Sequence, residues 1–167
     1  RLVPGFQGGV SCLGPGLCVL VGYNNSSVGD VVLVHHGAPG PGSAIKGSKS
    51  LYSVSCTEGA GCVAVGSPSD DVGTLVVTLN AAGAITSSRV LTVPGGVLLS
   101  HIACASVKDC VLGGNDVFAS PPALEVGHWD GTSLVLHQVK APSGTKGPII
   151  EGASCSGAAC LVVGYAS

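Results

Sequence analysis

The sequence predicts an all-β protein, a β-propeller made of repeated four-stranded antiparallel blades. One cysteine-containing motif occurs four times along the chain of 167 residues. The 27 glycines and 10 prolines disfavour long helices, and no segment shows the 3.6-residue apolar period of an amphipathic helix. The apolar runs are short and end at Gly, Pro, Asn or Asp, as strands that end in turns do. Repeats, composition and strand length therefore indicate the same fold class.

The repeated motif sets the length of the structural unit. Each copy has a small residue, a cysteine, a spacer of five residues (four in the last copy), a second cysteine, an aliphatic run and, in the same place, a glycine. The first cysteines are Cys12, Cys56, Cys104 and Cys155, which are 44, 48 and 51 residues apart. A period of this length with β composition is typical of one propeller blade per repeat.

We interpret residues 1–167 as a single propeller segment of about three and a half blades. The repeats span approximately residues 10–50, 51–98, 99–148 and, in part, 149–167. A half-built blade leaves strand edges unpaired, which natural proteins avoid. We therefore expect the chain to be part of a longer propeller. Two alternatives remain open: pairing of two half-propellers, or a four-bladed closure that uses an N-terminal strand at residues 2–5.

The second repeat gives the clearest strand pattern. Its predicted strands cover residues 51–56, 62–65, 74–79 and 85–93. Turns are predicted at 57–61 and 80–83, and a loop at 68–73, where Gly, Asn, Asp and Pro gather.

The first and third repeats follow the same course less regularly. In the third we predict strands over 123–128 and 133–139 around a turn at 129–132. In the first, the Pro- and Gly-rich stretch 38–42 is predicted to be a turn between strands at 31–35 and 44–46.

The cysteine spacing predicts one disulfide within each repeat. Cysteines that flank a short Gly-rich turn lie opposite each other in a β-hairpin, within reach of a disulfide. The predicted pairs are Cys12–Cys18, Cys56–Cys62, Cys104–Cys110 and Cys155–Cys160. Cys-x5-Cys is neither a standard zinc spacing nor the Cys-x-x-Cys of redox proteins, so we expect no metal ion or other cofactor. Structural disulfides in turn predict a secreted, extracellular protein.

The motif also carries a resemblance to a family. The stretch from Ser55 through Cys56 and Cys62 to Gly66, together with a turn around Trp129-Asp130-Gly131, resembles secreted β-propeller repeat proteins of actinobacteria. The cysteine motif covers the whole chain, whereas the Trp-Asp-Gly turn occurs only in the third repeat. The resemblance implies export and a repeat scaffold, and it carries over no catalytic residue.

A few residues are candidates for ligand binding. His101 falls on the first predicted strand of its blade, near the axis where propellers often bind ligands, although a His that hydrogen-bonds to backbone is the simpler interpretation. His128, Trp129 and Asp130 surround a turn, where an exposed Trp ring would stack on a sugar and a packed one would fill the space between blades. The pairs His35-His36 and Asp70-Asp71 are interpreted as solvated turn residues.

Composition narrows the function by exclusion. A net charge of −2 gives no electrostatic footprint for nucleic acid, and no apolar stretch is long enough for membrane insertion. We found no nucleophile elbow, Walker or dinucleotide-binding pattern, so we assign no catalytic residue.

The prediction is a non-catalytic binding or protein–protein interaction scaffold with an unknown protein or glycan ligand. The alternatives are a carbohydrate-binding or carbohydrate-active propeller with a site at the axis, and a self-assembling surface or fibre component. Further partners would be the remaining blades of one precursor or a second copy.

Overall fold

The computed structural model is all-β, and it describes residues 8–94, 96–116, 119, 123–140, 143 and 147–165. These residues form fourteen strands and no helix. The first sheet holds β1 (Val10–Gly14), β2 (Leu17–Tyr23), β3 (Gly29–His35) and β4 (Ala38–Ala44). The second holds β5 (Ser48–Thr57), β6 (Gly61–Pro68), β7 (Thr74–Asn80) and β8 (Ile85–Leu91). The third holds β9 (Val97–Ser106), β10 (Asp109–Asp116), β11 (Ala123–Trp129) and β12 (Leu134–Val139), and the fourth is a hairpin of β13 (Ile149–Ser156) and β14 (Ala159–Tyr165).

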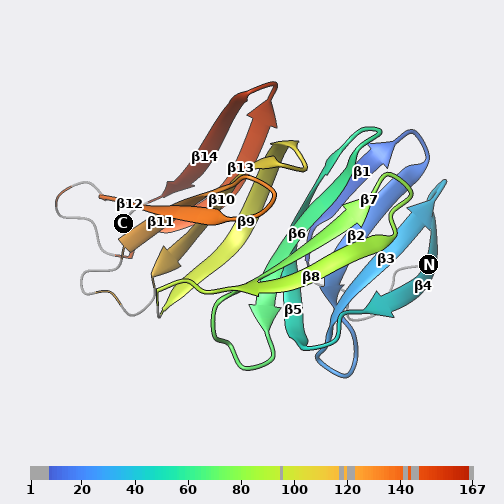
Figure 1. Cartoon of the computed structure of the whole chain (residues 1–167), viewed down its shortest axis with the longest axis horizontal. Coiled ribbons are helices and arrows are strands. Elements are labelled where there is room, and N and C mark those ends of the chain that lie inside the picture. The colour runs from blue at the N-terminus through green and yellow to red at the C-terminus, as the bar shows by residue number, and fades with distance from the viewer. Residues whose placement is uncertain are drawn as a thin grey trace.

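Each sheet is an antiparallel meander in which strands adjacent in sequence are hydrogen-bonded neighbours. The predicted repeat of four short strands is therefore confirmed for three sheets, and the fourth repeat contributes two described strands. The first sheet lies at the right of the molecule and the second in the middle, whereas the third sheet and the fourth hairpin share the left half (Figure 1).

Two apolar cores lie between consecutive sheets. Side chains alternate between the two faces of a strand, so one strand serves both cores. In β6, Cys62 and Ala64 pack with Val19 and other residues of the first sheet, whereas Val63 and Val65 pack against the third sheet. The second sheet is therefore buried on both faces near its first three strands, which explains the continuous burial of β6.

The sheets approach each other most closely at their first strands. β5 packs against β1 and β2 on one side and against β9 on the other, and β9 packs against β13. Among the described residues, the fourth strands β4, β8 and β12 make no comparably extensive contact with a neighbouring sheet. The sheets thus converge at one edge and diverge at the other.

One predicted element is wrong. Residues 38–42 were expected to form a turn, but Ala38–Ala44 is an outer strand, β4, and the following residues 45–46 lie outside it. The turn is shorter and lies at His36 and Gly37, whose φ angles of 49° and 82° suit a two-residue hairpin turn. The prolines of β4 are tolerated because the strand is at the sheet edge, where one side of the backbone needs no partner.

The other predicted strands of the second and third repeats are found with somewhat different ends. β5 and β6 extend to 48–57 and 61–68, so the turn between them is shorter than predicted, whereas β8 ends at Leu91. The predicted N-terminal strand at residues 2–5 lies outside the described residues.

Candidate binding surface at the disulfide-closed turns

The four predicted disulfides are present, one in the first hairpin of each sheet. Their Cα atoms are 3.8, 4.0, 3.9 and 4.1 Å apart in Cys12–Cys18, Cys56–Cys62, Cys104–Cys110 and Cys155–Cys160. In each case the two cysteines are directly opposed in the strand register. In the chain-entropy model, closing a loop this short stabilises the fold by about 2–2.5 kcal/mol. Four such bonds are typical of extracellular proteins.

The disulfide hairpins lie at one end of the sheets, which we call the turn end. It comprises the hairpins β1–β2, β5–β6, β9–β10 and β13–β14, together with the turns β3–β4, β7–β8 and β11–β12, because every other connection of an antiparallel meander falls at the same end. These hairpins lie along the upper edge of the molecule in Figure 1. Closely spaced, covalently closed turns are a common place for binding residues on a stable scaffold.

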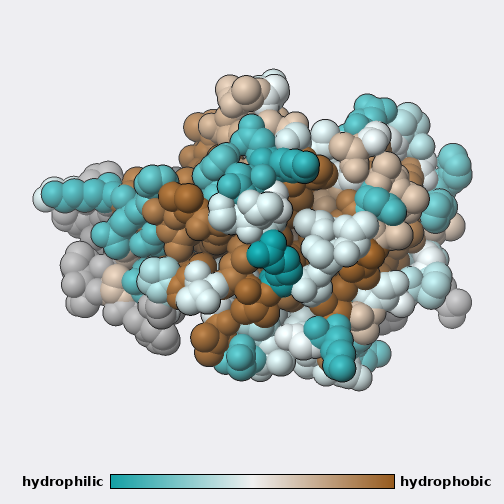
Figure 2. Space-filling view, in the orientation of Figure 1, coloured by the Kyte–Doolittle hydropathy of each residue, from teal (hydrophilic) through white to brown (hydrophobic). Residues whose placement is uncertain are grey.

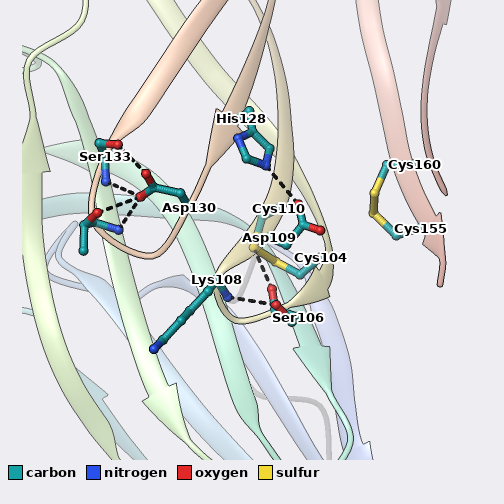
Figure 3. Close-up of polar contacts among 11 residues, drawn as sticks. Cys104, Ser106, Lys108, Asp109, Cys110, His128, Asp130, Ser133, Cys155 and Cys160 are labelled. Atoms are coloured by element: carbon teal, nitrogen blue, oxygen red, sulfur yellow. Dashed lines mark hydrogen bonds and ion pairs between the residues drawn. A yellow bond between two sulfur atoms is a disulfide. The ribbon is translucent and has the colours of Figure 1, made fainter. Parts of the chain in front are cut away.

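An exposed polar contact joins the ends of β10 and β11 in the third sheet. His128 Nε2 lies 2.9 Å from Asp109 Oδ1, and both side chains are about half exposed, at 50% and 49% (Figure 3). Val111 is opposite His128 in the ladder, so Asp109 is a diagonal neighbour of His128 on the same face of the sheet. Such an exposed pair stabilises the fold little, about 0–1 kcal/mol. Its accessible polar atoms remain able to contact a ligand.

Asp130 organises the neighbouring β11–β12 turn. Its Oδ1 accepts hydrogen bonds from the backbone N–H groups of Thr132 and Ser133 at 2.8 and 2.7 Å and from the Thr132 hydroxyl at 2.8 Å. Its Oδ2 accepts one from the Ser133 hydroxyl at 2.7 Å (Figure 3). Hydrogen bonds from Ser133, and then from Thr132, hold the pKa of the Asp130 carboxyl well below its usual range. Asp130 is therefore a turn-stabilising carboxylate in this structure.

The same turn rests on the disulfide hairpin beside it. Gly131 has a φ of +94°, and a Cβ added there would meet the side-chain carbons of Lys108 in the β9–β10 hairpin. Glycine is required for both reasons, the positive φ and the close approach. Lys108 in the β9–β10 turn and Asp109 at the start of β10 thus lie near His128 at the end of β11 and Asp130 in the turn that follows it (Figure 3).

The remaining candidates have different surroundings. Trp129 is 2% exposed and packs in the core between the second and third sheets with Val63, Val65 and others, so its ring is not open to stack on a sugar. Within the described structure its indole Nε1 has no hydrogen-bond partner. His101 is partly buried on β9 opposite Gly113, three residues before Cys104. The fold therefore does not bring His101 into the group around His128.

The pairs Asp70-Asp71 and His35-His36, which we interpret as turn residues, have local partners. Asp71 forms an ion pair with Lys49 across 2.6 Å, and Asp70 accepts a hydrogen bond from the backbone of Val72. His35 ends β3, and His36 lies in the β3–β4 turn. The backbone N–H of His36 donates a hydrogen bond to the Gly16 carbonyl at 2.8 Å. No group of three or more His, Cys, Asp or Glu side chains that could hold a metal ion occurs in the described part of the chain.

Sequence reasoning missed Asp109. Once Cys104 and Cys110 are placed opposite each other, residue 109 must end the hairpin turn. Its pairing with His128 depends in addition on the register of β10 with β11, and the residues between those strands do not fix that register. No motif in the sequence could therefore have identified this pair.

The comparisons with known proteins add no assignment. No protein-family model matches the chain, and no curated protein has a similar sequence. In the described residues there is also no helix long and apolar enough to cross a membrane.

Proposed function

We propose that the chain is a secreted, non-catalytic β-propeller scaffold that binds a protein or glycan ligand at its turn end. Three features of the molecule support it: the arrangement of the sheets, the disulfides, and the polar residues at the turn end.

The propeller assignment is supported by how the sheets converge. In a propeller, the first strands of four-stranded meander blades surround an axis and the fourth strands form the outer rim. Here β5 and β9 pack side by side, as do β9 and β13, while β4, β8 and β12 diverge. The resemblance of the cysteine motif to secreted actinobacterial propeller repeats agrees with this arrangement. Because disulfides persist in oxidising compartments, four of them support secretion.

The exposed Asp109–His128 pair is the observation that carries the binding proposal. Asp130 uses both of its oxygens inside its own turn, and Trp129 is buried, so both are committed to the fold. Asp109 and His128 contribute to no core, yet they are held between a disulfide hairpin and a tightly hydrogen-bonded turn. Polar groups positioned in this way before a ligand arrives lose little conformational entropy on binding, which favours affinity.

The test uses defined probes and a matched pair of variants. We would screen the purified, oxidised chain on an array of defined glycans and against a displayed peptide library. The best binder would then be titrated against Asp109→Asn/His128→Gln and, as a control, against Lys49→Gln/Asp71→Asn. The control removes the exposed Lys49–Asp71 ion pair, which lies away from the turn end.

We expect the turn-end variant to weaken binding at least tenfold and the control variant to leave it unchanged. The proposal is overturned if neither array yields a binder, or if both variants weaken binding equally. Turnover of an array glycan by the chain would overturn the non-catalytic part.

A further inference from the structure

Each sheet covers the aliphatic residues that follow the second cysteine of the preceding sheet. Val19 and Val63 come directly after that cysteine, and both are 0% exposed in the cores between consecutive sheets. In the third sheet the next inward position is Gly113, where an added Cβ would meet the side chains of Ile150 and Val162 in the fourth hairpin. The same face is therefore covered fully in the first two sheets and in part in the third, where Val111 is partly buried.

In the fourth hairpin this face is open. Leu161, which corresponds to Val19 and Val63, is 64% exposed, and Val163, two residues further on, is 50% exposed. We call the surface formed by Leu161 and Val163 the tail face. In Figure 2 the region of β13 and β14 has apolar surface beside hydrophilic surface. The corresponding aliphatic side chains are buried in the first two sheets, so the tail face offers apolar surface that a partner could bury.

The opposite side of the first sheet is open at the complementary position. Val10 lies two residues before the first cysteine and is 64% exposed, whereas the corresponding Val54 and Ile102 are 6% and 5% exposed. Val54 shares a core with Val19, and Ile102 shares one with Val63. We call the surface around Val10 the head face. Within the chain, a head position therefore packs against a tail position of the preceding sheet.

A polar contact accompanies this packing twice. Ser11 Oγ accepts a hydrogen bond from the backbone N–H of Cys56 at 3.0 Å, and Ser55 Oγ accepts one from Cys104 at 2.9 Å. Ser154 holds the corresponding place in the fourth hairpin, and Cys12 holds the corresponding place in β1. In these two contacts the serine hydroxyl accepts a hydrogen bond from the backbone of the first strand of the following sheet.

We propose that the tail face binds the head face of a second copy of this chain. The chain carries both halves of an interface that it already makes between its own consecutive sheets: the head face is on the first sheet and the tail face is on the fourth hairpin. In the complex, Leu161 and Val163 pack against Val10 of the second copy, and Ser154 Oγ accepts a hydrogen bond from its Cys12 N–H. The contact is head-to-tail, so it joins two different surfaces. It does not depend on ligand binding at the turn end.

The test is sedimentation velocity and multi-angle light scattering from micromolar to millimolar concentration. We expect the wild-type chain to rise from a monomer of 16.2 kDa to twice that mass or more. Val10→Lys and Leu161→Lys should each remain monomeric, because each loses one half of the contact. An equimolar mixture of the two variants should form a dimer, because the intact tail of the first meets the intact head of the second.

Controls separate assembly from folding and from the turn end. Val72→Lys replaces an equally exposed valine in the β6–β7 loop and should assemble as the wild type does. His128→Gln should also leave assembly unchanged. Far-UV circular dichroism and the absence of free thiols verify that each variant is folded. The proposal is overturned if the wild-type chain stays monomeric at millimolar concentration, if either single variant assembles alone, or if the mixture remains monomeric.

Discussion

Ser55 Oγ accepts a hydrogen bond from the backbone N–H of Cys104 across 2.9 Å, and this bond connects the second sheet to the third. The cysteines of a disulfide hairpin have closely spaced Cα atoms, as in a non-hydrogen-bonded antiparallel pair, so their N–H groups point away from the partner strand. Cys104 is on the edge strand β9, and its N–H would otherwise lack a partner. Ser11 makes the same bond to the Cys56 N–H, so in the first two repeats the serine before the first cysteine serves the next sheet and not its own.

Replacing this serine should destabilise the contact between sheets. We expect Ser55→Ala to lower the free energy of unfolding by about 1 kcal/mol, because the Cys104 N–H loses its acceptor in a partly buried position. Urea denaturation of the oxidised protein measures the change. Ser88→Ala, on the exposed outer strand β8, is the control and should have almost no effect. Equal effects of the two substitutions would contradict the linking role.

The third repeat offers the reverse experiment. Ala103 occupies the place of this serine, and Asn115 makes the polar contact to the fourth hairpin instead. The Asn115 Nδ2 donates a hydrogen bond to the Pro148 carbonyl at 2.5 Å, and its Oδ1 accepts one from the Ile150 N–H at 3.4 Å. We expect Ala103→Ser to raise the free energy of unfolding by about 0.5–1.5 kcal/mol through a bond to the Cys155 N–H. Slower amide exchange of Cys155 in the variant is the specific signature. An unchanged exchange rate would show that the register of β13 differs from that of β5 and β9.

The fold could be predicted to a large extent because the repeat multiplies weak local signals. Four copies of the cysteine motif establish hairpin, disulfide and period together, since Cys56 and Cys62 can be bonded only if their strands pair in one register. β4 was missed because Pro39 and Pro41 usually break strands, and only its edge position makes them acceptable.

The site was less predictable than the fold. The sequence identified the β11–β12 turn, yet whether Trp129 is buried depends on how the second sheet packs against the third. The partner of His128 depends on the register between β10 and β11. Both are tertiary properties that a local motif does not encode.

The glycine after the aliphatic run has a steric reason that can be tested. A Cβ added at Gly66 would collide with the carbonyl oxygen of Ser50 on the neighbouring strand β5. We expect Gly66→Ala to cost about 1–3 kcal/mol, the usual cost of forcing a methyl group into a filled space. Gly152→Ala is the control, because its Cβ would make only an ordinary contact of 3.7 Å with Val163. Thermal unfolding of both variants distinguishes a steric requirement from a general effect of glycine replacement.

Asp30 should make the stability fall with rising pH. Burial raises the pKa of its carboxyl above the ordinary 3.8, although backbone N–H groups of Val31 and Ser43 partly oppose the shift. The folded state then binds the proton more tightly than the unfolded state, so stability is lost as pH rises from 3.8 through the raised pKa. We expect Asp30→Asn to be more stable than the wild type near neutral pH and equally stable below the unfolded pKa. A difference independent of pH, measured by urea denaturation, would show that the carboxylate charge is not its cause.

Asp130 should have the opposite pH dependence. Its pKa lies below the ordinary 3.8 because Ser133 and Thr132 donate hydrogen bonds to the ionised carboxylate. The unfolded state therefore takes up the proton first, and the stabilisation is complete above the unfolded pKa and lost as pH falls through 3.8 toward the lowered folded value. We expect Asp130→Ala to destabilise the protein near neutral pH and to do so much less in strong acid. Urea denaturation across this pH range measures the difference, and Asp70→Ala, in another turn, serves as the matched control.

Because the Asp130 carboxylate holds the turn that packs beside Lys108, Asp130→Ala should also speed amide exchange in the β9–β10 hairpin. Unchanged exchange in that hairpin would mean that the two turns are held independently.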